Sequence, residues 1–137
     1  MGNTVVAISP DSKALYHAAA VMVSNQIVAL ADMGTALLVK CGFSEAAAAE
    51  ALSPLLLGNA QSLAEKGAVN ALTGPIERGD AQTVSKHLQE IRKFAAESTV
   101  GQDILTAYTA LSKQLIRIAQ QKHPHKDYKH LEKELEQ

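Results

Sequence analysis

The chain has 137 residues, the size of one ordinary domain, and its 13 basic and 14 acidic side chains leave a net charge of −1. This balance gives no electrostatic attraction to nucleic acid or anionic lipid, and the absence of Trp argues against a base-stacking surface. The single cysteine, Cys41, excludes an intramolecular disulfide framework and a multi-cysteine zinc site. The hydrophobic content of 47% is typical of a folded protein.

The first ten residues contain neither the basic start nor the long apolar run of a signal peptide. Asn3–Ser9 is predicted to form a short strand or an extended linker, so residues 1–10 are interpreted as a linker or as the residual strand of a missing N-terminal domain. Polar residues such as His17 and Asp32 in the apolar stretch that follows argue against a membrane span. We expect a soluble protein in a reducing, cytoplasmic compartment.

One long helix is predicted from Asp11 or Ser12 to Cys41, with Asp11 as its N-cap and Gly42 as its stop. About 30 residues at 1.5 Å each give roughly 45 Å. A compact chain of this size is only roughly 37 Å across. The predicted helix is also apolar on most of its circumference, which normally means burial on all sides. A second copy of the chain would bury it, so the sequence predicts a dimer.

Two shorter helices are expected next. Ser44 is the predicted N-cap of the first, and Pro54 is expected to end or kink it near Ser53. The second begins at Leu55 and is expected to stop at Gly67.

Two longer helices follow the most turn-rich stretch of the chain. Asp80 ends that stretch and is placed to cap a helix over about 81–96. Ser98 or Thr99 begins the next helix, which runs to about Lys122 with apolar residues at helical spacing.

The C-terminal residues 123–137 are expected to form a charged helix or tail, in which Asp127 would cap a short helix to Glu136. Three histidines lie here: His123, His125 and His130. Their spacing is not a strong pattern for metal ligands, and the charged surroundings favour a solvated segment. No metal is therefore expected.

A polar stripe interrupts the apolar surface of the long predicted helix. Because successive helical residues are about 100° apart, Lys13, His17 and Ser24 share one face, with Asn25 about 80° from His17. Small alanines between these residues would let a ligand approach closely. His17 has an imidazole that can act as acid or base near neutral pH. Ser24 and Asn25 can hydrogen-bond a carbonyl or hydroxyl group. The alternative is that these groups satisfy one another, or a neighbouring loop, in a helical core.

A second candidate site is the turn-rich stretch Thr73–Asp80. Its two glycines permit positive φ angles and its proline fixes one φ, so the backbone can hold Thr73 and Arg78 toward an anionic ligand. The alternative is an ordinary turn between helices, in which Asp80 caps the next helix and Arg78 pairs with Asp80 or Glu77.

Several stretches together resemble one family. They are Lys-Ala-Leu-Tyr-His-Ala-Ala-Ala-Val at 13–21, Ser-Asn at 24–25, Ser-Pro-Leu-Leu at 53–56, Ala-Leu-Thr-Gly-Pro-Ile-x-Arg-Gly-Asp at 71–80 and Thr-Val-x-x-His-Leu at 83–88. The resemblance, over about residues 5–119, is to the C-terminal helical domain of two-domain Rossmann proteins, which is catalogued as a domain of unknown function. That domain is similar in fold to the C-terminal domains of 6-phosphogluconate dehydrogenase, ketopantoate reductase and pyrroline-5-carboxylate reductase.

The resemblance implies an all-α helical bundle around a long central helix, which dimerises through such helices. In full-length relatives a Rossmann domain would hold NADP or NAD, and substrate would lie between the domains. Residues 11–122 would then form the dimerisation and substrate domain. The missing Rossmann domain is expected in cis or in trans, and no cofactor is expected on this chain alone.

The resemblance also implies roles for the polar residues. His17 and Asn25 would be catalytic, because the related reductases place a Lys or His and an Asn on a comparable helix to polarise a carbonyl or imine. Four residues would bind substrate: Lys13, Ser24, Thr73 and Arg78. Without its Rossmann half the chain is expected to be inactive. Two alternatives of other classes remain open, a stand-alone helical interaction module and a small-molecule-binding domain.

Overall fold

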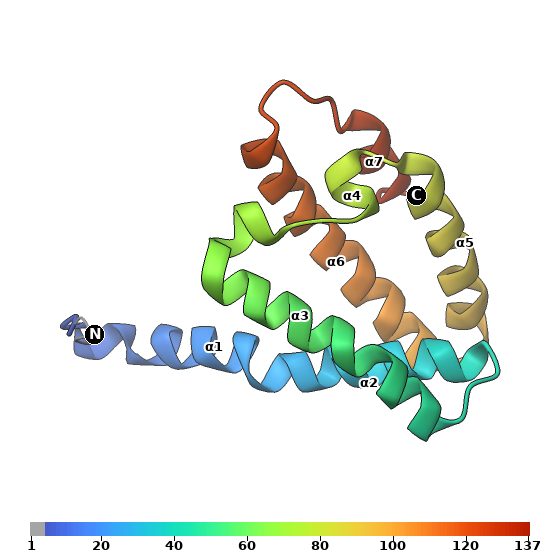
Figure 1. Ribbon diagram of the computed structural model, residues 1–137, viewed down its shortest axis with the longest axis horizontal. Helices are drawn as coiled ribbons and strands as arrows, with labels where there is room; N and C mark the ends of the chain where they lie inside the picture. Colours follow the sequence, from blue (N-terminus) through green and yellow to red (C-terminus); the bar gives the residue numbers. More distant parts are fainter. Residues whose placement is uncertain (1–4) are drawn as a thin grey trace. The chain divides into compact units, whose positions relative to one another are not determined.

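The computed structural model describes residues 5–137, and all regular secondary structure within them is helical, as the ribbon shows (Figure 1). This confirms the predicted all-α class, which follows from a composition rich in Ala and Leu. The chain divides inside one helix into two compact units. We call the residues up to Ser53 unit 1, and Pro54–Gln137 unit 2.

Unit 1 is built from four elements: η1 (Pro10–Ser12, a short 3-10 helix), α1 (Lys13–Val23), α2 (Asn25–Lys40) and the start of α3 (Glu45–Ala71). The single uninterrupted helix predicted from Asp11 to Cys41 is therefore wrong, because the chain breaks at Ser24. The Ser24 Oγ donates a hydrogen bond to the carbonyl oxygen of Ala20 at 2.7 Å, and its ψ is −69°. A hydroxyl that bonds the carbonyl four residues back often bends a helix.

The stretch before η1 has no regular secondary structure from Val5 to Ser9. The strand predicted over 3–9 is thus not formed in the part that the structure describes, and Asn3 lies outside the described residues. The alternative, an extended linker, stays a prediction.

Of the two outcomes predicted for Pro54, an end of the helix near Ser53 is wrong, because α3 continues through Pro54 to Ala71. The other outcome, a kink, stays a prediction. The proline lacks an N–H group, so it removes one hydrogen bond of the helix without stopping it. The predicted stop at Gly67 is confirmed in the backbone, where φ is 72° and ψ is 168°. Only glycine adopts this conformation readily, so α3 consists of two helices that meet at Gly67.

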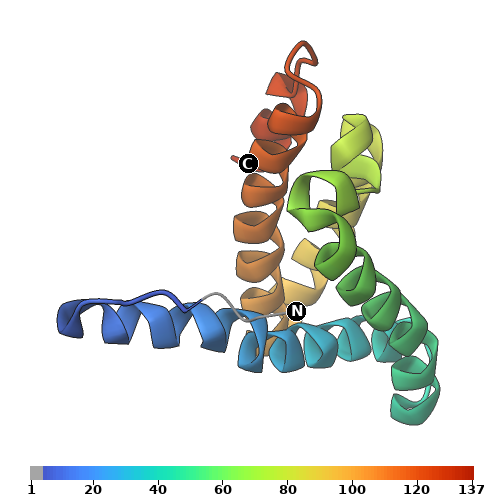
Figure 2. The same cartoon turned by 60° about the vertical axis from the view of Figure 1, so that its left-hand side comes forward.

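Unit 2 contains the rest of α3 and four further helices: α4 (Pro75–Arg78), α5 (Ala81–Glu97), α6 (Thr99–Lys122) and α7 (Lys129–Glu134). The caps predicted for α5 and α6 are confirmed. The Asp80 carboxylate accepts a hydrogen bond from the Thr83 N–H, and the Ser98 hydroxyl oxygen accepts one from the Gly101 N–H, both at 3.0 Å. Helices α5 and α6 run antiparallel from Ser98, and α4 and α7 lie between their diverging ends (Figure 1 and Figure 2).

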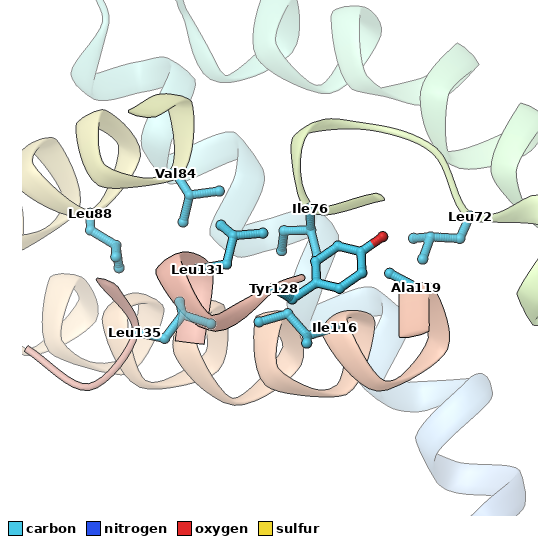
Figure 3. Close-up of a cluster of buried hydrophobic side chains, with 9 residues drawn as sticks. All are labelled: Leu72, Ile76, Val84, Leu88, Ile116, Ala119, Tyr128, Leu131 and Leu135. Carbon is cyan, nitrogen blue, oxygen red and sulfur yellow. The ribbon is translucent and has the colours of Figure 1, made fainter. Parts of the chain in front are cut away.

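The core of unit 2 gathers where these four helices meet (Figure 3). It consists of nine buried side chains: Leu72, Ile76, Val84, Leu88, Ile116, Ala119, Tyr128, Leu131 and Leu135. Three of them, Tyr128, Leu131 and Leu135, come from the segment that was expected to be solvated. That expectation is wrong for these side chains, because their spacing of three and four residues places them on one helical face.

Unit 1 has almost no core of its own. Ala48 is the one buried residue among residues 5–53, and it lies in the part of α3 that belongs to this unit. Large apolar side chains of α1 and α2 are exposed: Leu15, Tyr16, Met22, Val23, Val28, Leu30 and Val39. At one place the helices of unit 1 do approach closely, since a Cβ at Gly34 would lie 3.1 Å from the Leu52 Cδ1.

The consecutive elements η1, α1 and α2 together form a stretch, Pro10–Lys40, with a mean hydropathy of 1.4. It is the one helical stretch in residues 5–137 that is long and apolar enough to cross a membrane. Length and composition alone give this result, and a signal sequence or the core helix of a soluble protein meets the same criteria. None of its most apolar window is buried.

Candidate functional site

The six predicted site residues are all exposed and fall into two sets. Four lie in unit 1, on α1 or at its junction with α2: Lys13, His17, Ser24 and Asn25. Two lie in unit 2, on the segment that connects α3 to α5: Thr73 and Arg78. Unit 1 by itself buries none of the first set.

The break at Ser24 organises the polar stripe of unit 1. The Ser24 Oγ lies 2.7 Å from the Ala20 carbonyl oxygen and 3.0 Å from the Asn25 Oδ1, so its one proton is donated to either acceptor in turn. Ser24 and Asn25 thus satisfy one another in part. His17 lies two turns earlier, about 10 Å along the helix axis. Within the described residues, no hydrogen bond joins its ring to Ser24 or Asn25.

The backbone of the segment 72–80, which we call the α4 loop, depends on two glycines, as predicted. Gly74 has φ 98° and ψ −171° before the four-residue helix α4, and Gly79 has φ 71° and ψ 27° after it. Pro75 occupies the first helical turn, where its missing N–H costs nothing. The amide of Asp80 donates back to the Pro75 carbonyl at 2.8 Å, which closes the turn around Arg78.

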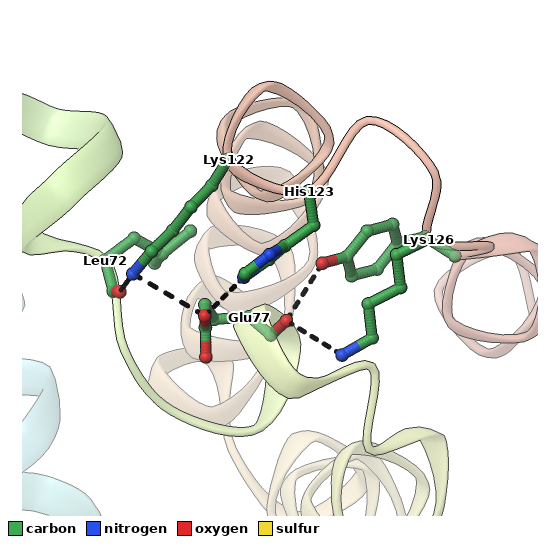
Figure 4. Close-up of polar contacts among 6 residues, drawn as sticks. Leu72, Glu77, Lys122, His123 and Lys126 are labelled. Carbon is green, nitrogen blue, oxygen red and sulfur yellow. Dashed lines mark hydrogen bonds and ion pairs between the residues drawn. The ribbon is translucent and has the colours of Figure 1, made fainter.

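Side chains from the C-terminal end of α6 and the residues after it hold this loop (Figure 4). The Lys122 Nζ donates to the carbonyl oxygen of Leu72 at 2.8 Å and lies 3.5 Å from the Glu77 Oε1. The His123 Nε2 lies 2.6 Å from the same oxygen. The Tyr128 hydroxyl donates to the Glu77 carbonyl oxygen at 2.9 Å. We call Lys122, His123 and Tyr128 the C-terminal clamp.

Both carboxylates of the α4 loop are already engaged. The hydrogen bond with His123 is the main cause that lowers the pKa of Glu77, and the charge of Lys122 acts in the same direction. Hydrogen bonds from the Thr83 backbone and hydroxyl lower the pKa of Asp80, with a smaller contribution from the charge of Arg78. No ion pair joins Arg78 to either carboxylate in the part of the chain that the structure describes, so the pairing considered for the ordinary turn is wrong.

A further polar contact links α5 to α6. The His87 Nδ1 lies 3.0 Å from the Tyr108 hydroxyl oxygen, and the two rings meet edge to face at 86°. Burial raises the pKa of Tyr108, while its hydrogen bond with Ser112 acts in the opposite direction. The contact between His87 and Tyr108 thus links α5 to α6.

The α4 loop can present a cation at a fixed place. Arg78 carries five N–H donors in a planar fork that matches carboxylate and phosphate oxygens, and its guanidinium is exposed on a tied backbone. Glu77 and His123 are bound to each other and are less available for ligand. Sequence reasoning missed the clamp, because its members lie about 50 residues from their partners. The one local signal was the apolar spacing of Tyr128, Leu131 and Leu135.

Residues 1–115 match the model of a protein family described as Domain of unknown function (DUF2520). No curated protein and no solved structure matches the chain. The matched region includes all six predicted site residues and the α4 loop, whereas Lys122, His123 and Tyr128 lie beyond its end.

Proposed function

The chain belongs to the family described as Domain of unknown function (DUF2520), and on this premise we propose that it is the dimerising, substrate-side helical domain of an NAD(P)-dependent oxidoreductase. The Rossmann domain that holds NADP or NAD is expected in cis or in trans, in the cytoplasm. The stretches at 13–25 and 71–88, which resemble the C-terminal domains of two-domain Rossmann proteins, support this assignment. The chain by itself is proposed to be inactive.

Residues 5–137 do not themselves fit a dinucleotide. A Rossmann site needs a strand, a glycine-rich turn and a helix N-terminus around the pyrophosphate, and the described part of the chain forms no strand. The proposal therefore assigns the cofactor to the other domain. This chain contributes assembly and substrate binding.

The observation that carries the proposal is the exposed apolar surface of unit 1. On α1 and α2, five large apolar side chains are at least 60% exposed: Leu15, Tyr16, Met22, Val23 and Val28. A folded monomer rarely leaves so much apolar surface uncovered, and such surfaces mark interaction sites. A second copy would cover it by a self-complementary interface, in which the same helices face each other.

The polar residues on this surface supply the proposed substrate contacts. The exposed imidazole of His17 can donate a hydrogen bond to a carbonyl or imine group of the substrate. Asn25 uses its Oδ1 toward Ser24, which leaves its N–H groups as donors for the same group. Lys13 and Ser24 are proposed to bind the substrate beside them.

The α4 loop supplies the second part of the proposed substrate side. Arg78 is proposed to bind an anionic group of the substrate through paired N–H donors, with the exposed Thr73 hydroxyl next to it along the loop. A small keto acid carries both groups that the two sets recognise, a carbonyl and a carboxylate.

Light scattering of the purified chain at micromolar concentration tests the dimer. The expected mass is twice 14.5 kDa. Leu30→Asp places a charge on an apolar side chain of α2 that is 42% exposed, and it should shift the mass toward the monomer. Val100→Asp is the matched control in unit 2, where the side chain is 48% exposed, and should leave the dimer intact. A wild-type mass of 14.5 kDa would refute the dimer.

The melting temperature in the presence of pyruvate tests the substrate side. Pyruvate is expected to raise it, and both Arg78→Ala and His17→Ala should abolish the shift. Arg117→Ala is the control, because it removes an exposed guanidinium that lies on α6 away from the α4 loop and bonds Gln114 at 3.1 Å. If no small anion or carbonyl compound shifts the wild type, the substrate role is wrong and the stand-alone interaction module is favoured.

The oxidoreductase context has its own test, the mass of the native protein in its source cells, detected with an antibody against this chain. A mass near twice 14.5 kDa or more under denaturing conditions supports a Rossmann domain in the same chain. The isolated chain should not oxidise NADPH with any small keto acid or imine. Oxidation by the purified chain would contradict the proposed inactivity.

The apolar stretch Pro10–Lys40 gives a second candidate for what covers unit 1, a lipid bilayer. Lys13, His17 and Asp32 within that stretch oppose insertion, since charged and polar groups are costly in hydrocarbon. We therefore expect the chain to stay in the supernatant when phosphatidylcholine vesicles are sedimented. Co-sedimentation that Leu30→Asp abolishes would assign the surface to a membrane instead of a second copy.

A further inference from the structure

The α4 loop is held at three separate acceptor atoms, and the C-terminal clamp contacts each of them. The acceptors are the carbonyl oxygens of Leu72 and Glu77 and the Glu77 Oε1. The loop is therefore fixed at its start and in the middle of α4 (Figure 4). A further residue packs over its end, where a Cβ at Gly79 would lie 3.1 Å from the Lys126 Cε. Lys126, outside the clamp, adds a longer bond of 3.5 Å from its Nζ to the Glu77 carbonyl oxygen.

The loop needs such support, because its own structure is weak. Helix α4 has only four residues, and one turn of helix fixes many backbone angles for few hydrogen bonds. The flanking glycines add conformational freedom that an isolated loop would keep. Bonds from Lys122 and His123 to the Glu77 carboxylate oppose this freedom, and charge-assisted bonds are the stronger kind.

The clamp is itself anchored. Tyr128 is 2% exposed and packs in the same core as Leu131 and Leu135, so its hydroxyl reaches the Glu77 carbonyl from a rigid position. Lys122 and His123 are the last residue and the C-cap of α6. The loop is thus attached both to the end of α6 and to the N-cap residue of α7, whose side chain is buried.

We propose that the C-terminal clamp, which lies beyond the family-matched region, sets the conformation of the α4 loop and with it the position of Arg78. Lys122, His123 and Tyr128 are positioning residues in this scheme, because they touch the loop and no substrate. The effect of these three residues on ligand binding rests on the proposed function above, whereas their effect on the conformation of the loop is independent of it.

Amide hydrogen exchange on the full-length chain tests the clamp directly. The amides of Arg78, Gly79 and Asp80, which bond within the α4 loop, report its opening. Lys122→Met combined with His123→Ala should raise their exchange rates about tenfold, the equivalent of one net hydrogen bond. Amides in the middle of α6 should change less than about twofold.

Three further variants make this result specific. Tyr128→Phe keeps the buried ring and removes only the hydroxyl donor, so it should raise the same rates several-fold even if the double variant fails to fold. Lys122→Arg should restore protection that Lys122→Met loses. Lys129→Met with His125→Ala is the matched control, because both side chains are exposed and neither contacts the loop.

Two outcomes overturn the clamp. One is unchanged exchange at residues 78–80 in both Tyr128→Phe and the double variant. The other is an equal rise in amide exchange rates throughout unit 2, which would mean that the clamp contacts stabilise the core of unit 2 and not the loop in particular.

Binding of inorganic phosphate, followed by chemical shifts of the Arg78 side chain, separates this inference from the proposed function. Weaker phosphate binding in Tyr128→Phe, with unchanged binding in the control Lys129→Met with His125→Ala, supports both the clamp and the anion-binding role of Arg78. Absence of phosphate binding in the wild type, together with opened loop amides in the clamp variants, overturns the anion-binding role of Arg78 and supports the clamp.

Discussion

Units 1 and 2 differ in where their apolar residues lie. Helices α1 and α2 of unit 1 are on average more hydrophobic than α5 and α6 of unit 2, yet they bury none of their residues. The less apolar α5 buries four side chains at positions 84, 88, 91 and 95, a stripe along one helical face. Hydrophobic content therefore does not by itself produce burial.

The arrangement of the apolar side chains explains this difference. A stripe needs neighbours on one side only, and α4, α6 and α7 cover the stripe of α5 within the same unit. Apolar side chains around the whole circumference need neighbours on several sides, which the described residues of unit 1 do not supply. Unit 2 thus buries its apolar stripe internally, whereas the described residues of unit 1 leave their apolar side chains exposed.

Substitution at the most closely packed glycine of unit 2 is expected to cause the largest loss of stability. A Cβ at Gly101 would lie 2.4 Å from the carbonyl oxygen of Phe94, a backbone atom that cannot turn away. Gly101→Ala should therefore destabilise the chain by about 3 kcal/mol or more, measured by urea unfolding. Gly58→Ala is the matched control, because nothing lies within 4 Å of its Cβ position in helix α3. It should be neutral or stabilising by up to about 1 kcal/mol, since alanine favours helix.

Matched leucine truncations in the two units test the comparison itself. Leu131 is 1% exposed in the core of unit 2, and Leu131→Ala should cost about 3 kcal/mol. Leu15 is 75% exposed on α1, so Leu15→Ala should cost less than about 0.5 kcal/mol in the dissociated chain. Thermal unfolding at several concentrations measures both. Equal losses at the lowest concentration would mean that unit 1 has an internal core after all.

Backbone strain in the α4 loop gives a smaller effect. At Gly74 the φ of 98° and ψ of −171° belong to a region that only glycine populates, and nothing lies within 4 Å of its Cβ position. Gly74→Ala should therefore cost about 2 kcal/mol through the backbone alone. Calorimetric unfolding measures it. An unchanged melting temperature would show that the loop adopts another conformation.

Acid should weaken the contact between the α4 loop and the clamp, the smallest of these effects. The pKa of Glu77 is lowered in the fold, chiefly by its hydrogen bond with His123. Its contribution is thus complete above the ordinary glutamate pKa of about 4.3 and is lost as the pH falls through the lowered value. Between about pH 5 and 3 the melting temperature of the wild type should fall more steeply than that of Glu77→Gln. Glu90→Gln, at an exposed pair with Lys93, should follow the wild type.

Local rules were sufficient where a helix carries its own signals. Asp80 and Ser98 gave the starts of α5 and α6, because side-chain oxygens before an amphipathic stripe cap a helix wherever it packs. Local rules failed in opposite directions at Ser24 and Pro54. A hydroxyl bond to Ala20 interrupted a strong helical pattern, whereas the helix did not end at Pro54, one of the two outcomes predicted for that proline.

The candidate site was predictable only in part. The positive φ angles at Gly74 and Gly79 follow from the residue type and were expected. The partners of Glu77 were not, because no rule of spacing connects residues that lie 46 or 51 positions apart. The alternative considered from the sequence paired Arg78 with Asp80 or Glu77, whereas Glu77 bonds residues that are distant along the chain.

The single-residue connection between α5 and α6 has a consequence for the order of folding. Ser98 alone joins the two helices, so the chain entropy lost when they meet is small, and we expect this hairpin to form in the folding transition state. Contacts of the clamp close loops of about 50 residues and should form afterwards. In φ-value terms, Leu88→Ala should slow folding while Leu131→Ala mainly speeds unfolding. The segment that carries Arg78 would then be the last part of unit 2 to be ordered, and its opening would not require the helical hairpin to separate.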